Sequence, residues 1–177
     1  MNKIIACGID QGLANLGYAF IEYDLDTNHY TKLATGTLKT KSSELLEKRL
    51  LNIYEMIKTS NLKYNTNIIA CEKLFYNPKQ SEGRNKSASI MTTNMVTGIV
   101  FLVAGELDLW IKEFVPGTVK KQVAGYGRAT KEDLQIAIED FCEEHGIEAK
   151  TNHETDAIGI ALTAIKSYIE EKIKKGA

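Results

Sequence analysis

Short apolar runs that end in turn residues divide the first part of the chain. Residues 3–10 form one such run, which closes on Asp10 just before Gly12, and residues 16–23 and 30–38 follow after two polar turns. Runs of this length, bounded by turn residues, are typical of buried strands. Short turns join antiparallel neighbours. The first 38 residues therefore predict a meander of three antiparallel strands.

Helical spacing of the apolar residues begins after residue 42. In residues 43–59, apolar side chains recur every three or four positions, which places them on one face of a helix. Similar patterns predict helices at 87–106, at about 130–145 and at 152–174, with short strands at 67–72 and 109–115. Five positions of helix 87–106 are expected to be buried: Ile90, Met91, Met95, Ile99 and Leu102.

The order of these elements predicts an α/β domain with a mixed five-stranded sheet, three antiparallel strands followed by parallel ones, and helices on its faces. Strand 67–72 is reached through a helix and should run parallel to the first strand. Asp10 and Glu72 then lie at the same edge of the sheet. Pro116 stops the fifth strand, and residues 116–130 are expected to form a connection. Thr130 with Asp133, and Thr151 with Glu154, have the spacing of helix capping boxes.

Composition narrows the class of protein. A chain of 177 residues with 44% hydrophobic and 25% charged residues, and without a linker-like stretch, is expected to be one domain over residues 1–177. The longest apolar stretch, 96–105, is too short to span a membrane, and no signal peptide is expected. The three cysteines are far apart, which argues against disulfides and zinc and favours a reducing cytoplasm.

Charge is unevenly distributed. The net charge of −1 does not by itself indicate nucleic-acid binding, but residues 114–131 contain no acid and four basic residues: Lys120, Lys121, Arg128 and Lys131. Such a run is often only a solvated surface. Here it is interspersed with glycines beside the expected acidic edge of the sheet, so we interpret it as a phosphate-binding segment.

Three acids at the borders of apolar segments are the candidate chemistry. Asp10 and Glu72 end buried strands, and Asp156 lies in the first part of the last helix. Taken singly, Asp10 could cap a turn and Asp156 could interact with the helix dipole. Taken together they require a cation, and carboxylates without clustered cysteines suit Mg²⁺ or Mn²⁺. Two such ions about 4 Å apart can support phosphodiester cleavage.

Four motifs follow one another along the chain: GIDQG at 8–12 with Gly17-Tyr18, CEKLF at 71–75, PGTVKKQVAGYG at 116–127, and HETDAIGIA at 153–161. In their order and spacing they resemble the RuvC-type Holliday junction resolvases of the RNase H-like superfamily. The resemblance implies an RNase H-like fold, a homodimer, and magnesium-dependent paired nicking of four-way DNA junctions in recombination and repair. It also implies a cytoplasmic setting, and it leaves a bacterial or viral origin open.

The resemblance assigns roles to individual residues. It makes Asp10, Glu72 and Asp156 ligands of two Mg²⁺ ions, with His153 in the fourth ligand position, where many members have Asp. Glu154 is the alternative fourth ligand, although the capping box already gives it a structural role. A histidine would reduce the negative charge of the site, so Mn²⁺ is expected to support activity at least as well as Mg²⁺.

The resemblance also places the DNA. Phe75, with Tyr76 as a weaker candidate, would stack on bases at the junction centre. Lys120 and Lys131 would bind the scissile phosphate. Further DNA contacts are expected from Lys79, Arg84, Lys86, Lys121 and Arg128.

Other functions share parts of this pattern. Actin-like and sugar-kinase-like ATPases also carry an acid and a glycine after a strand, but they need a much longer chain. A non-catalytic nucleic-acid-binding module would not need all three acids. An RNase H-fold nuclease for other branched DNA or RNA–DNA hybrids would share the metal chemistry and stays open. Helix 87–106 is the expected dimer interface, and no segment indicates a helicase partner.

Overall fold

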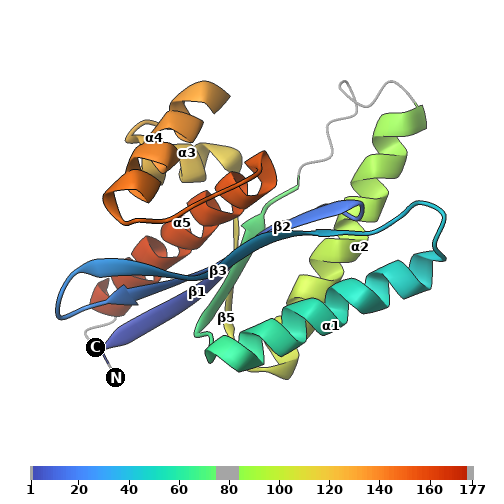
Figure 1. Cartoon of the computed structure of the whole chain (residues 1–177), viewed down its shortest axis with the longest axis horizontal. Coiled ribbons are helices and arrows are strands. Elements are labelled where there is room, and N and C mark those ends of the chain that lie inside the picture. The colour runs from blue at the N-terminus through green and yellow to red at the C-terminus, as the bar shows by residue number, and fades with distance from the viewer. Residues whose placement is uncertain (1, 75–83, 175–177) are drawn as a thin grey trace.

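The computed structural model describes residues 2–74 and 84–174, with the backbone alone for residues 84–89. The strands are β1 (Lys3–Asp10), β2 (Asn15–Asp24), β3 (His29–Lys39), β4 (Ile68–Glu72) and β5 (Trp110–Phe114). The helices are α1 (Leu46–Tyr64), α2 (Arg84–Glu106), α3 (Pro116–Ala124), α4 (Lys131–Glu144) and α5 (Asn152–Lys174) (Figure 1).

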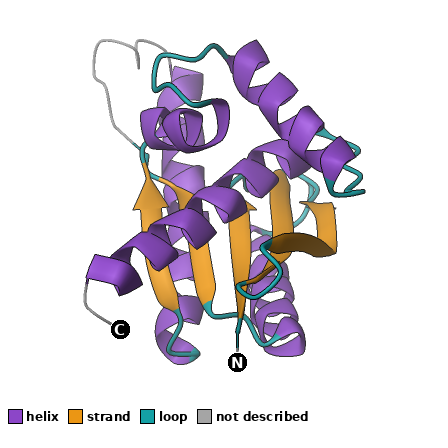
Figure 2. Ribbon diagram, turned by 90° about the vertical axis from the view of Figure 1, so that its left-hand side faces the viewer, coloured by secondary structure: helices purple, strands orange, loops and turns teal. Residues whose placement is uncertain are grey.

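The five strands form one sheet in the order β3-β2-β1-β4-β5 (Figure 2). β1, β2 and β3 pair antiparallel, while β4 pairs parallel to both β1 and β5. This arrangement confirms the predicted mixed sheet. Because β1 and β4 are parallel neighbours, their carboxyl-terminal residues, Asp10 and Glu72, meet at one edge.

Helices cover both faces of the sheet (Figure 1). α5 packs on one face, where Ala6, Ala19 and Ala70 of the sheet meet Ala157, Ala161 and other buried residues of α5. α1 and α2 pack on the opposite face, against Ile9, Phe20 and Ile69. Alternating side chains of a strand point to opposite faces of the sheet. The apolar runs of β1 and β4 therefore contribute residues to the hydrophobic core on each face.

Two glycines allow α5 to approach the sheet closely. A side chain at Gly8 of β1 would collide with the backbone of Ala157, and one at Gly17 of β2 would collide with the backbone of His153. Both neighbours lie in the first two turns of α5. The bare backbone at these two positions therefore fixes the start of α5 against the strand that ends in Asp10.

The expectation that residues 116–130 form only a connection is wrong. Residues Pro116–Ala124 form the helix α3, and Gly125 ends it at a φ of 89°. Proline suits the first turn of a helix, where its missing N–H is not needed, so Pro116 starts a helix as well as ending a strand. Val119 is buried one turn later, against α5. Lys120 and Lys121 therefore lie on a helix.

The buried face of α2 also differs from the expectation. Val96, Val100 and Val103 are fully buried against the sheet, whereas three positions expected to be buried are exposed: Met91, Met95 and Leu102. The sequence pattern was ambiguous because α2 is apolar on both sides, and a spacing argument cannot tell which side faces the sheet.

Of the two predicted capping boxes, one forms completely and the other in part. Thr130 and Asp133 form the predicted reciprocal capping box of α4. Thr151 accepts the Glu154 N–H as expected, but the Glu154 carboxylate accepts the N–H of Lys150 rather than that of Thr151. Among residues 2–74 and 84–174, none of the helices combines the length and hydrophobicity that a membrane span requires.

Candidate active site

Asp10 and Glu72 lie side by side at the carboxyl-terminal edge of the sheet. Ile9 of β1 pairs with Cys71 of β4, so the next residue of each strand is the acid. Both carboxylates line one cavity of about 240 Å³. The geometry predicted from the two apolar runs is therefore present.

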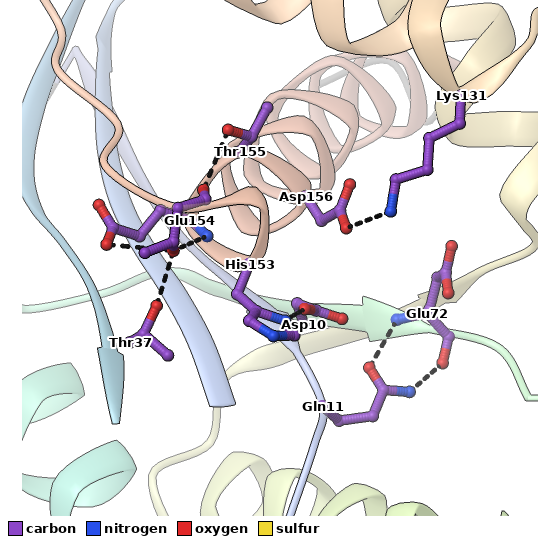
Figure 3. A network of polar contacts seen from close by, with 10 residues as sticks. Asp10, Gln11, Thr37, Glu72, Lys131, His153, Glu154, Thr155 and Asp156 are labelled. Atoms are coloured by element: carbon purple, nitrogen blue, oxygen red, sulfur yellow. Dashed lines mark hydrogen bonds and ion pairs between the residues drawn. The ribbon is translucent and has the colours of Figure 1, made fainter. Parts of the chain in front are cut away.

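The first turns of α5 bring two more groups to this edge (Figure 3). Asp156 lines the same cavity as Asp10 and Glu72. The Nδ1 atom of His153 lies 2.6 Å from Oδ2 of Asp10, and it donates to this oxygen whenever it carries a proton. His153 and Asp156 are three positions apart in α5, so their side chains lie on one face of the helix.

Glu154 is directed elsewhere. It is buried, with 6% of its surface exposed, and its carboxylate accepts hydrogen bonds from the Lys150 N–H at 3.1 Å and from the Thr151 hydroxyl at 3.3 Å. The Thr151 hydroxyl lies 2.8 Å from that of Thr37 on β3. The structure thus brings His153, and not Glu154, into contact with Asp10 (Figure 3). Glu154 therefore binds the segment that starts α5, and Thr151 connects this segment to β3.

Two lysines face the acids. Lys131, the first residue of α4, lies 3.6 Å from Oδ2 of Asp156. Lys120, on α3, lines the cavity with Lys131. Apolar side chains of Val119, Leu134 and Ile160 form the rest of its wall. The cavity therefore presents negative charge from the sheet and α5, and positive charge from α3 and α4.

Burial and mutual repulsion perturb the strand-end acids. Burial raises the pKa of Glu72, and the charges of Asp10 and Asp156 raise it further. Burial also raises the pKa of Asp10, although the hydrogen bond from His153 opposes the shift. Both carboxyl groups are therefore harder to ionise than free acids, and a positive ligand beside them would favour their ionised forms.

The donor atoms suit a hard divalent cation. Carboxylate oxygens of Asp10, Glu72 and Asp156, with one imidazole nitrogen of His153, are the ligand types that Mg²⁺ and Mn²⁺ accept. In the described part of the chain, no group of three or more His, Cys, Asp or Glu side chains is arranged to hold a metal as it stands. Asp10 is hydrogen-bonded to His153, and Asp156 is paired with Lys131. These contacts engage one oxygen of each aspartate.

Replacing Glu72 by glutamine should stabilise the metal-free protein at neutral pH. An acid whose folded-state pKa is raised destabilises the fold as pH rises through that pKa. In chelator, Glu72→Gln is therefore expected to raise the melting temperature at pH 7.5 by roughly 2–4 °C, the shift that about 1 kcal/mol causes in a domain of this size. The gain should disappear below the ordinary glutamate pKa of 4.5, where the parent carboxyl is neutral in both states.

Thermal unfolding in chelator from pH 4 to 8 measures this effect. Glu55→Gln, at an exposed position of α1, is the matched control and should leave the curve unchanged. A Glu72→Gln protein that is less stable than the parent at pH 7.5 would show that the acids do not repel one another in the fold.

The predicted DNA contacts are placed unevenly. Lys120 and Lys131 lie at the cavity, whereas Lys121 and Arg128 are exposed on α3 and on the α3–α4 connection. Five further candidates lie outside the described residues or have undescribed side chains: Phe75, Tyr76, Lys79, Arg84 and Lys86. The basic segment therefore begins beside the acids and continues along α3 and the α3–α4 connection.

Sequence reasoning missed the residues that hold the acids in place. The buried side chain of Gln11 bonds to the backbone of Glu72, and Thr37 reaches Thr151 across 114 residues of sequence. The contact of Gln11 with Glu72 had a signal in the sequence, because a polar residue directly follows the acid that ends a strand. The Thr37 contact depends on tertiary packing and has no local signature.

Comparison with known proteins places the chain in a family. The model of the family "Crossover junction endodeoxyribonuclease RuvC" matches residues 6–164. The chain belongs to the RuvC family. The crossover junction endodeoxyribonuclease RuvC of Rickettsia typhi is 35% identical to it over 166 residues, which is 92% of this chain and 97% of the relative. RuvC proteins act as nucleases, so the chain is an enzyme, and the resemblance inferred from its motifs is confirmed.

Solved structures agree on the RuvC fold. The structure of Thermus thermophilus RuvC matches with a TM-score of 0.78 and 23% identity, covering 95% of this chain and 97% of the other. A structure of the T. thermophilus RuvC in complex with a Holliday junction substrate matches with a TM-score of 0.75 and 22% identity, over 90% and 92% of the two chains. The predicted RNase H-like architecture is therefore that of RuvC.

Proposed function

We propose that this protein is a crossover junction endodeoxyribonuclease that resolves four-way DNA junctions by paired, metal-dependent nicks. One observation carries the proposal: three acids from β1, β4 and α5 share a cavity with two lysines, in a chain of the RuvC family. The relatives are named for this activity, and one solved relative is bound to a Holliday junction.

Asp10, Glu72 and Asp156 would hold the metal, with His153 as the fourth ligand. Bound Mg²⁺ or Mn²⁺ supplies Lewis-acid stabilisation of the phosphoryl oxygens and an activated water. Asp10 lies between Glu72 and His153, so it would hold the metal together with both of them. Burial and repulsion raise the pKa of Glu72 and of Asp10, and a bound cation would favour the ionised form of both acids.

Lys120 and Lys131 would bind the scissile phosphate. They approach the cavity from α3 and α4, on the side opposite the sheet. Lys131 is paired with Asp156 at 3.6 Å, a distance loose enough for the ammonium to turn toward a phosphate. Lys121 and Arg128 would extend the phosphate track, and Phe75 would stack at the junction centre.

A homodimer completes the proposal. At 100° per residue, Met91, Met95, Gly98 and Leu102 fall within about 60° of arc on α2, opposite the buried valines. Met91 is 67% exposed and Leu102 is 60% exposed. Exposed apolar stripes of this kind mark interaction sites, and two nicks at a two-fold junction require two active sites. A second copy of α2 is the partner we propose for this stripe.

Metal preference tests the role of His153. Imidazole is a poorer ligand for Mg²⁺ than carboxylate is, so the parent should cleave at least as fast in Mn²⁺ as in Mg²⁺. His153→Asp should shift the preference toward Mg²⁺, measured as the ratio of the two cleavage rates. Glu154→Gln is the comparison, and it should destabilise the fold while leaving the ratio unchanged. A strict Mg²⁺ preference of the parent would contradict His153 as a ligand.

The proposed activity is tested directly on a synthetic four-way junction with each strand labelled. We expect symmetric nicks in two opposing strands, dependent on added Mg²⁺ or Mn²⁺ and abolished by chelator. Binding without cleavage under these conditions would favour a non-catalytic module instead. The protein is expected to act in the reducing cytoplasm, where its three buried cysteines stay thiols.

A further inference from the structure

The side chain of Gln11 extends the ladder between β1 and β4 by one residue. Ile9 and Cys71 form the last register pair. One position further, the Glu72 N–H donates to Oε1 of Gln11 at 3.1 Å, and the Glu72 carbonyl accepts from Nε2 of Gln11 at 2.5 Å (Figure 3). A side-chain amide therefore takes the place of the main chain where β1 has ended.

This pair of bonds is specific to a carboxamide. Gln11 is 6% exposed, so its polar atoms and those of the Glu72 backbone have little access to water. Leaving such groups without partners destabilises the folded arrangement. A carboxylate has no donor for the Glu72 carbonyl, and an apolar side chain satisfies neither group.

The position of Gln11 connects two of the proposed metal ligands. Gln11 follows Asp10 directly in the chain, and its hydrogen-bonding partner carries the Glu72 carboxylate. On the β5 side, the backbone next to Glu72 is held through the Lys73 N–H, which bonds to the Phe114 carbonyl. Gln11 supplies the corresponding restraint on the β1 side, so the end of β4 is fixed from both neighbouring strands.

We propose that Gln11 is a positioning residue, which sets the placement of Glu72 relative to Asp10 and thereby the affinity of the site for its divalent metal. The inference rests on the proposed function, because that is where Asp10 and Glu72 are assigned to the metal. Gln11 does not itself contact the metal, since both polar atoms of its side chain bond to the Glu72 backbone.

The first measurement concerns the metal-free protein alone. Gln11→Met keeps the length of the side chain and removes its donor and acceptor. Amide hydrogen exchange followed by NMR should show the Glu72 N–H exchanging about tenfold faster or more in the variant. The Ala70 N–H, in the same strand but paired with the β1 main chain, should stay within about twofold of the parent.

The second measurement is Mn²⁺ binding by calorimetry in the absence of DNA. Loss of a group that orients a ligand typically weakens metal binding by 10–100-fold, so the Kd for Mn²⁺ should rise about tenfold or more in Gln11→Met. In cleavage assays Gln11→Met should leave the KM for junction DNA unchanged. Its kcat should be lower than that of the parent at limiting Mn²⁺ and equal to it at high Mn²⁺. Gln135→Met, which removes an amide bonded to Glu139 on the surface of α4, is the matched control and should change neither.

Each outcome decides the inference. Unchanged exchange at Glu72, or faster exchange with an unchanged Kd for Mn²⁺, would overturn the positioning role. A purely structural role would lower the melting temperature without shifting the Kd. A parent that binds Mn²⁺ but does not cut junctions would refute the proposed function while the two Kd values still decide the role of Gln11. A parent that binds no Mn²⁺ would overturn both.

Discussion

The Asp10→Asn protein is expected to bind four-way junctions normally and to cleave them at least about 10³-fold more slowly than the parent. Asp10 lies between Glu72 and His153, and it would hold the metal together with both of them. Asparagine keeps the shape and one acceptor oxygen, so the hydrogen bond from His153 can persist and the fold is retained. It loses the charge on which the metal depends, and a bound metal is worth several kcal/mol in the transition state.

Single-turnover cleavage rates on a labelled junction measure this loss, with gel-shift affinity and the melting temperature as checks. Asp140→Asn, at an exposed position of α4, makes the same chemical change away from the cavity and should be fully active. An Asp10→Asn protein that cleaves within about tenfold of the parent would mean that the cavity at the β1–β4 edge is not the active site.

The Leu102→Glu protein is expected to be a monomer that has lost paired nicking. Leu102 is exposed on the outer stripe of α2, with Met91 and Met95 on the same side. In a two-fold dimer each copy would contribute the glutamate to one interface. An unpaired buried charge costs about 3–5 kcal/mol, so the dimer Kd should rise by about 100-fold or more.

Sedimentation at micromolar concentration, together with the ratio of paired to single nicks, reports both effects. Ile136→Glu is the matched control, because Ile136 is 56% exposed on α4 and lies outside the stripe. A parent that is already monomeric at this concentration, or a Leu102→Glu protein that is still a dimer, would contradict the proposed dimer interface on α2.

The sheet and the meeting of Asp10 with Glu72 were predictable because they follow from local patterns. Two apolar runs that end in acids, joined through a helix, leave few options once crossover rules are applied. The position of Asp156 also followed, since an acid in the first turns of a core helix must lie at the edge of the core. These predictions used the periodicity of the chain, the rules for strand crossovers and the cost of burying an isolated charge.

The errors arose where two structures satisfy the same local pattern. Pro116 fits both the end of a strand and the first turn of α3, and only the packing of Val119 against α5 decides. α2 is apolar on both sides, so spacing could not show that Val96 and Val100 face the sheet while Met91 faces outward. The contact of His153 with Asp10 joins residues 143 positions apart, and the resemblance of the motifs, rather than local spacing, assigned both residues to one site.

The most direct test of the account is one cleavage panel under identical conditions. It compares a four-way junction, a flap, a linear duplex and an RNA–DNA hybrid, each with Mg²⁺, with Mn²⁺ and with chelator. We predict paired nicks in the four-way junction with either metal and none with chelator, and rates on the other substrates that are lower by at least about tenfold, the effect of roughly 1.4 kcal/mol. Cleavage of the hybrid without cleavage of the junction would contradict the proposed substrate. Junction cleavage that persists in chelator would contradict the proposed metal dependence.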